Sequence, residues 1–220
     1  MTTKTKEDSS EATAFINNVR LSFPTLRRKQ ASVPGGKEKY SASFIIDPET
    51  PQGKAAIAAC KVAIAAAEMN HFKKPGVVKT IDDPKRIAFR PGNKFKNAEG
   101  DVYAGYEGMV GVTSTSQKRP KLYTVQGAKA REEVEVEDIE DLFYGGVYCN
   151  AEVNFYCVSS KEQGGRGLFC EIRGIMTKER GEAFGGGAPV NSLNLLDDDD
   201  MDDGLGESGE VLDDDDDLLG

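Results

Sequence analysis

Basic and aromatic side chains occur together in three stretches of the chain, and this combination suits the binding of a single-stranded nucleic acid. Lysine and arginine attract phosphates, and an exposed aromatic ring stacks on a base with about 1 to 3 kcal/mol per base. The first stretch is FPTLRRK at residues 23–29, the second runs from Arg86 to Tyr106, and the third is KRPKLY at residues 118–123. We therefore predict a basic surface that carries stacking rings.

The predicted contacts are the basic residues of these stretches and the rings that lie in or beside loops. The following basic residues are expected to contact phosphates: Arg27, Arg28, Lys29, Arg90, Lys94, Lys96, Lys118, Arg119 and Lys121. The following rings are expected to stack on bases: Phe95, Tyr103, Tyr106 and Tyr123. Phe23, Phe44 and Phe89 share strand faces with aliphatic residues, so we predict that they lie in the core. Stacking depends little on the base, so the predicted binding has weak sequence preference.

Residue patterns typical of catalysis or metal binding do not occur in the sequence. The single histidine, His71, follows an alanine-rich segment next to lysines and is predicted to lie at a solvated helix end. The carboxylates at Asp82 and Asp83 and in residues 132–141 lie in runs that are expected to face solvent. The four cysteines form no CxxC pair and are expected to be buried free thiols in a reducing cytoplasm. We predict a protein that is not an enzyme and that holds no metal or cofactor.

Charge is distributed unevenly along the chain. The sequence has 28 Lys and Arg against 37 Asp and Glu, which gives a net charge of -9. Residues 197–220 contain thirteen acids and no base, whereas residues 12–131 contain 21 basic and 9 acidic residues, a net charge of +12. An acidic segment tethered to a basic body competes with nucleic acid for that body. We therefore predict that the tail is a built-in competitor.

Strands and one main helix must position these side chains. Alternation with a period of two at residues 145–158 and 168–176, across a glycine-rich turn, predicts a hairpin. Thr50 as a cap, Pro51 in the first turn and an alanine-rich run predict a helix that ends at Pro75. Further strands are predicted at 15–23, 39–47, 109–114 and 121–125, and a short helix at 137–143. This order predicts a mainly β protein with an OB-fold-like antiparallel β-barrel, one main α-helix and extended loops.

Composition divides the chain into three segments. Residues 1–11 are expected to be a flexible N-terminus, 12–180 the OB-fold domain, and 181–220 a disordered Gly- and Asp-rich acidic tail. Leucines punctuate the acidic runs, so we expect the tail to bind partner proteins; an inert solubilising tail is the alternative. The predicted partner-binding residues are Asp213, Asp214, Asp215, Asp216, Asp217, Leu218 and Leu219. Without an apolar run of about 18 residues or an export signal, we expect no membrane contact and a cytoplasmic location, in the host cell if the protein is phage-encoded.

Several segments carry a resemblance to a known family. They are NNVRLSFP, RPGNKF, YEGMVGV, FYGGVYCNAEVNFYCV and GLFCEIRGIMTKERGEAFGGG, followed by the Asp-rich tail. With them the chain resembles, over essentially its whole length, the single-stranded DNA-binding proteins of tailed bacteriophages. The resemblance implies an OB barrel that binds single strands without sequence preference during DNA replication, recombination and repair. It also implies a tail that recruits replication proteins such as a DNA polymerase or a helicase.

Two questions stay open at this point. An acidic-tailed chaperone or DNA mimic, whose body only presents the tail, is the alternative function. Self-association through the extended loops is possible, but no residue pattern requires it. The tails of the family often end on an aromatic residue, whereas this chain ends Asp-Leu-Leu-Gly.

Overall fold

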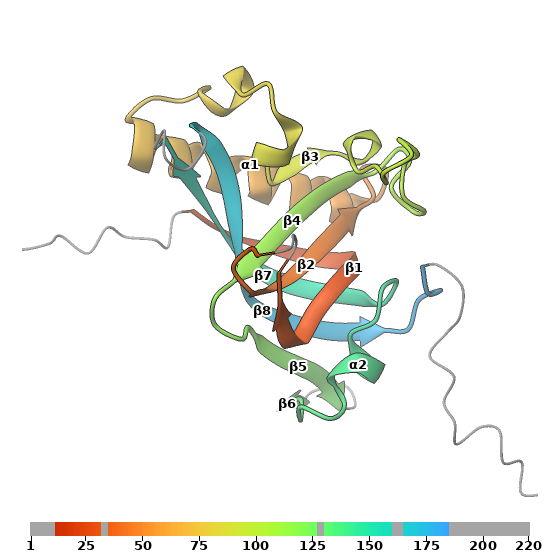
Figure 1. Ribbon diagram of the computed structural model, residues 1–220. Helices are drawn as coiled ribbons and strands as arrows, with labels where there is room; N and C mark the ends of the chain where they lie inside the picture. Colours follow the sequence, from red (N-terminus) through yellow and green to blue (C-terminus); the bar gives the residue numbers. More distant parts are fainter. Residues whose placement is uncertain (1–11, 32–34, 127–129, 160–164, 185–220) are drawn as a thin grey trace, which may run out of the picture. The chain divides into compact units, whose positions relative to one another are not determined.

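Strands dominate the computed structural model, which describes residues 12–31, 35–126, 130–159 and 165–184 (Figure 1). In chain order the elements, with η for 3-10 helices, are β1 (Thr13–Gln30), β2 (Lys39–Ile46), α1 (Pro51–Phe72), η1 (Val78–Thr80), η2 (Pro84–Arg86), β3 (Phe89–Pro91), η3 (Gly92–Lys94), β4 (Val110–Ser116), β5 (Lys121–Gln126), β6 (Ala130–Glu133), α2 (Ile139–Leu142), β7 (Tyr148–Val158) and β8 (Gly167–Glu179). No helix in the described part of the chain is long and apolar enough to cross a membrane.

Five of the strands close into a barrel. The sheet has the order β3-β4-β2-β1-β7-β8-β5-β6, and a further pairing of β4 with β8 joins Thr115 to Glu171 in parallel register. Strands β4, β2, β1, β7 and β8 therefore form a closed ring, while β3, β5 and β6 extend it at the sides. This confirms the predicted OB-like barrel. The β4–β8 pairing that closes the barrel is parallel, and so is the pairing of β5 with β8. The other ladders are antiparallel.

The core fills the barrel with the inward faces that the alternation predicts. On β7 and β8 the inward side chains include Val153, Phe155 and Ile172, and on β2 Phe44 is fully buried. Phe89 is half-buried against the same cluster. All four cysteines are free and buried, and burial raises the pKa of each thiol, that of Cys60 to about 12.

The main helix forms as its sequence predicts. The Thr50 hydroxyl accepts a hydrogen bond from the Gly53 N–H at 3.0 Å, and Pro51 occupies the first turn. The helix ends where Lys73 takes a left-handed conformation and donates its N–H to the Met69 carbonyl. An alanine-rich face of α1, which includes buried Cys60, packs against β1 and β7.

The pairing register of β1 shifts at three places, and the shift beside Phe23 overturns a prediction. The register shifts between Ile16 and Val19 and again between Ser22 and Thr25, and the chain has positive φ at Asn18 and Phe23. A bulge adds a residue to the strand and turns its side chain to a different face. The ring of Phe23 is therefore 52% exposed, and the prediction that it lies in the core is wrong.

Residues that follow β8 pack on the barrel. The Phe184 N–H donates to the Gly145 carbonyl at 2.9 Å, and the Tyr144 hydroxyl donates to the Gly181 carbonyl at 2.9 Å. Gly146 has a φ of 116°, and a Cβ there would lie 2.1 Å from the Glu182 carbonyl oxygen. Residues 181–184, which follow the predicted domain end at Arg180, therefore contact the barrel. The segments 1–11 and 185–220, including the acidic runs, lie outside the described residues.

Candidate nucleic-acid interface

Four rings form one cluster on the outer face of the barrel, which we call the aromatic platform. It consists of Phe23 from β1 and of Phe95, Tyr103 and Tyr106 from the loop between η3 and β4. The Phe23 and Tyr103 rings meet edge to face with centroids 4.8 Å apart. The Phe95 and Tyr106 rings stack at 4.5 Å, and Phe23 lies nearly parallel to Tyr106 at 6.3 Å.

The two layers of the platform have different exposure. Phe23 and Tyr103 are 52% and 38% exposed, so both rings offer area to a ligand. Phe95 and Tyr106 are only 5% and 0% exposed, because they pack on Ile45 of β2. The prediction that Phe95 and Tyr106 are exposed stacking rings is therefore wrong: they support the outer pair. Burial raises the pKa of the Tyr106 phenol, although nearby serine hydroxyls of β1 and β2 oppose that shift.

Glycines allow the platform loop to lie this close to the sheet. A Cβ at Gly111 of β4 would lie 2.3 Å from the Phe95 ring, and one at Gly92 would lie 1.8 Å from the Tyr106 carbonyl oxygen. The loop is closed by a hydrogen bond from the Tyr103 N–H to the Phe95 carbonyl at 3.0 Å. Any side chain at either glycine would therefore lift the rings from the barrel.

Two arginine side chains lie near the platform. The Arg90 guanidinium carbon lies 3.9 Å from the centroid of the Phe95 ring, and its Nη1 donates to the Ile87 carbonyl at 2.8 Å. Burial lowers the pKa of Arg90, while Tyr106 acts to raise it. Its buried Nε has no hydrogen-bond partner among the described residues. Arg20 lies 4.1 Å over the ring of Phe184, which packs against the buried rings of the platform.

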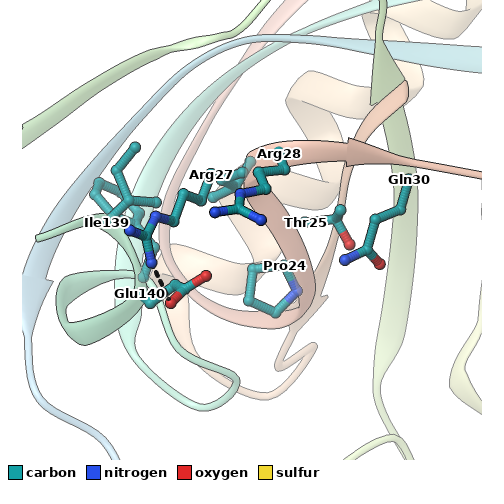
Figure 2. A pocket seen from close by; sticks show the side chains of 9 residues that line it. Pro24, Thr25, Arg27, Arg28, Gln30, Ile139 and Glu140 are labelled. Carbon is teal, nitrogen blue, oxygen red and sulfur yellow. Dashed lines mark hydrogen bonds and ion pairs between the residues drawn. The ribbon is translucent and has the colours of Figure 1, made fainter. Parts of the chain in front are cut away.

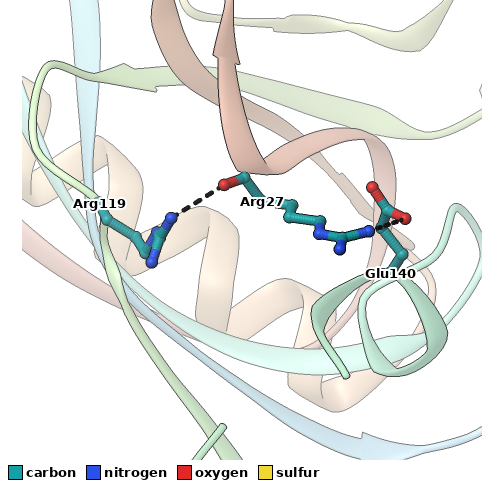
Figure 3. A network of polar contacts seen from close by, with 3 residues as sticks. All are labelled: Arg27, Arg119 and Glu140. Carbon is teal, nitrogen blue, oxygen red and sulfur yellow. Dashed lines mark hydrogen bonds and ion pairs between the residues drawn. The ribbon is translucent and has the colours of Figure 1, made fainter. Parts of the chain in front are cut away.

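A second group of basic residues lies at the far end of β1. Arg28 and Lys29 are exposed there, and the Lys29 Nζ and the Arg119 guanidinium lie 5.8 and 5.6 Å from the centroid of the Tyr40 ring. Arg119 also donates from Nη2 to the Arg27 carbonyl at 2.9 Å (Figure 3). We call Arg28, Lys29, Arg119 and Tyr40 the basic end.

Arg27, a predicted phosphate contact, is paired with an acid. Its Nη1 lies 2.9 Å from Oε2 of Glu140 in α2, and both side chains are partly exposed (Figure 3). The pair forms one wall of a cavity of about 300 Å³ between β1 and α2, and Thr25 and Gln30 lie across the cavity from it (Figure 2). Glu140 therefore offsets part of the positive charge that Arg27 and Arg28 bring to this cavity.

Small hydroxyl side chains connect the platform to the basic end. One row pairs Ser22 with Ser43 and Ser43 with Thr113, across β1, β2 and β4, and its two serines are buried. The next row pairs Thr25 with Ser41 and Ser41 with Thr115, and these three side chains are half-exposed. Short side chains leave room for a ligand to lie close to the sheet between the two groups.

Of the other residues predicted to contact DNA, three lie in the two groups and two lie on β5. Lys94 and Lys96 are exposed on the platform loop, and Lys118 precedes Arg119 at the basic end. Lys121 and Tyr123 instead lie on β5. Tyr123 is half-buried and, with Phe15 of β1, lines a different cavity of about 170 Å³. The structure thus brings most predicted contacts into two groups and leaves those of β5 apart.

The described residues offer no arrangement for metal chemistry. They contain no cluster of three or more His, Cys, Asp or Glu that could hold a metal ion. His71 is exposed at the end of α1, where its Nε2 lies 2.9 Å from the hydroxyl of Ser159. What the surface offers is stacking area, positive charge and hydroxyl groups.

Comparison with known proteins agrees with this geometry. The family described as Enterobacter phage Enc34, ssDNA-binding protein, matches residues 12–205. Putative protein p50 of Acyrthosiphon pisum secondary endosymbiont phage 1 is 27% identical over 184 residues, 83% of this chain and 91% of that protein. The single-stranded DNA-binding protein from bacteriophage Enc34 in complex with ssDNA has a TM-score of 0.63 at 20% identity, with 79% of this chain and 90% of that chain covered. Another structure of the Enc34 protein gives 0.61 at 20% identity, with coverage of 84% and 90%. At this identity the structural likeness supports the fold alone.

Proposed function

The chain belongs to the family of Enterobacter phage Enc34 ssDNA-binding proteins, and from that premise we propose that it binds single-stranded DNA without sequence preference. The aromatic platform is the observation that carries the proposal. Two exposed rings rest on two buried rings, and a base stacked on Phe23 or Tyr103 would gain about 1 to 3 kcal/mol. No catalytic role is part of the proposal.

The charges around the platform support the same function. Lys94 and Lys96 on the platform loop, and Arg28, Lys29 and Arg119 at the basic end, are all exposed. A strand lying across the half-exposed row of Thr25, Ser41 and Thr115 between them would keep its phosphates within reach of both groups. Double-stranded DNA should bind more weakly, because its paired bases cannot reach the rings.

We assign the wider roles of the protein to its acidic C-terminal residues. The tail is proposed to compete with DNA for the basic surface and to recruit replication proteins, such as a DNA polymerase or a helicase, through Asp213–Asp217, Leu218 and Leu219. These roles fit a protein that protects single strands during phage DNA replication, recombination and repair in the host cytoplasm. They rest on the charge pattern and on the family.

The test is fluorescence polarisation with a labelled oligo-dT across a salt titration. We compare the full chain, a chain that ends at Leu196, and a full-length control in which Asp213–Asp217 become Asn. We expect salt-sensitive binding by all three chains at low salt, tightest for the chain that ends at Leu196 and intermediate for the Asn variant, which removes five of the thirteen acidic residues of the tail.

Each part of the proposal has its own contradicting result. Failure of the truncated chain to bind the oligonucleotide at low salt would refute DNA binding by the body. Equal affinities of the three chains at all salt concentrations would refute the competitor. Binding of basic proteins alone would favour the alternative, an acidic-tailed chaperone or DNA mimic, and metal-dependent loss of the oligonucleotide would indicate a nuclease.

A further inference from the structure

A second pair of aromatic rings, an exposed tyrosine and a half-buried phenylalanine, lies at the far end of the β7–β8 hairpin. Tyr156 of β7 and Phe169 of β8 are cross-strand partners, and their rings stack with centroids 5.9 Å apart and planes 27° apart. Tyr156 is 40% exposed. The neighbouring residues of both strands, such as Phe155 and Leu168, point into the barrel and supply the core. The Tyr156–Phe169 pair is therefore on the outer face of the barrel.

A positioned arginine completes this outer pair. The Arg86 guanidinium carbon lies 5.5 Å from the centroid of the Phe169 ring. Its Nε and Nη2 donate to the carbonyls of Arg166 and Gly165, each at 2.8 Å. The guanidinium is thus fixed by neutral carbonyls and keeps its positive charge available. Two stacked rings beside an arginine that makes no ion pair with a described residue have the composition of a single-strand stacking site.

The register connects this site to the aromatic platform. From β1 the row of hydroxyl residues runs through β2 to Thr113 of β4, whose N–H donates to the Ala88 carbonyl at 2.8 Å. The Ala88 N–H in turn donates to the Leu168 carbonyl at 2.8 Å, and Phe169 follows on β8. Four steps between adjacent strands, each about 4.8 Å wide, give about 20 Å along the barrel surface. Arg86 and Arg90 lie two residues on either side of Ala88, which is the third of the four steps and precedes β8.

We propose that Tyr156, Phe169 and Arg86 form a second stacking site for the same single strand of DNA that lies on the aromatic platform. The inference rests on the proposed function and extends it, because a bound strand then crosses β4 and continues onto the β7–β8 hairpin. Burial raises the pKa of the Tyr156 phenol, and the nearby Glu171 carboxylate adds to that shift. Its charge would repel phosphates, so the strand would pass with its bases on the rings and its phosphates toward Arg86.

Tryptophan reporters test the second site, because the natural sequence contains no tryptophan. Phe23→Trp reports on the platform and Tyr156→Trp on the second site, since a base stacked on an indole quenches its fluorescence. Val62→Trp, at an exposed position of α1, is the control for quenching that does not depend on stacking. Each variant of the full chain is titrated with oligo-dT of increasing length.

We expect short oligonucleotides to quench only Phe23→Trp and longer ones to quench Tyr156→Trp as well, with Val62→Trp unchanged. In a companion measurement, Tyr156→Ala should weaken binding of the long oligonucleotide by about fivefold or more and leave the short one unaffected. Quenching of Phe23→Trp at every length without any change in Tyr156→Trp would overturn the second site. Equal quenching of both reporters by the shortest oligonucleotide would overturn the shared track. If neither reporter responds, the proposed function itself fails.

Discussion

Removing the ring of Phe23 gives the sharpest prediction for DNA binding. The ring is 52% exposed and forms the outer layer of the aromatic platform together with Tyr103. One lost base stack costs about 1 to 3 kcal/mol, and each 1.4 kcal/mol is a tenfold change in affinity. We therefore expect Phe23→Ala to weaken oligo-dT binding by about 5- to 150-fold.

The backbone at this position separates binding from folding. Phe23 has a φ of 47°, a left-handed conformation that costs a residue with a Cβ about 1 to 2 kcal/mol and costs glycine almost nothing. Phe23→Gly should therefore be more stable than Phe23→Ala by about 1 kcal/mol. Because both variants lack the ring, they should lose the same amount of DNA affinity.

Fluorescence polarisation measures the affinity, and thermal unfolding measures the stability. Phe15→Ala is the control, since Phe15 is another exposed ring of β1 but lies beside Tyr123, away from the platform. If either variant of Phe23 bound oligo-dT as tightly as the natural protein, the platform would have no role in stacking. If the affinities of the two variants differed in the order of their stabilities, the loss would come from folding and not from the ring.

Three further predictions concern the surroundings of the platform and the core. Glu140→Gln should free Arg27 for a phosphate and tighten oligo-dT binding by up to about fivefold at low salt, since a surface ion pair contributes about 0.2 to 1 kcal/mol. Gly105→Ala should lower the melting temperature, because a Cβ there would lie 2.4 Å from the Phe184 ring on a backbone with positive φ. All four cysteine thiols should react slowly with a thiol reagent at pH 8 and rapidly in denaturant, since burial raises their pKa values in the folded protein.

Matched variants check these three predictions. Glu137→Gln removes the same charge from the turn before α2, so an equal gain in affinity would show that Arg27 is not involved. Gly108→Ala introduces the same backbone strain where a Cβ would meet nothing within 4 Å, and an equal loss of stability would rule out the Phe184 contact. Fast labelling of the native protein would contradict the burial of the thiols.

The alternating strands and the helix could be predicted because their signals are local. The period of two on β7 and β8 follows from one buried face, and Thr50 with Pro51 marks the start of α1 within a few residues. The exposure of the Phe23 ring was not predicted, because the alternation argument assumes a regular strand. The adjacent Pro24 was a sign of irregularity, since proline cannot donate to a ladder.

The site was predicted less accurately than the strands, because contacts between residues far apart in the sequence decide which site residues are exposed. Phe95 and Tyr106 are buried because the loop that contains them folds back onto Ile45, which lies about fifty residues earlier in the chain. The partner of Arg27 is Glu140, 113 residues away in the sequence. The sequence shows where basic and aromatic residues occur together. The tertiary fold decides which rings reach solvent and which arginines pair with an acid.

The contacts of Arg20 join the first strand of the body to the residues that follow its last strand. Arg20 donates to the carbonyl of Glu182, 162 residues later, and lies over the ring of Phe184, which packs against the loop of Tyr103. The first strand leaves the ribosome long before these residues are made. A nascent chain therefore makes these contacts only after all the strands of the barrel have been synthesised.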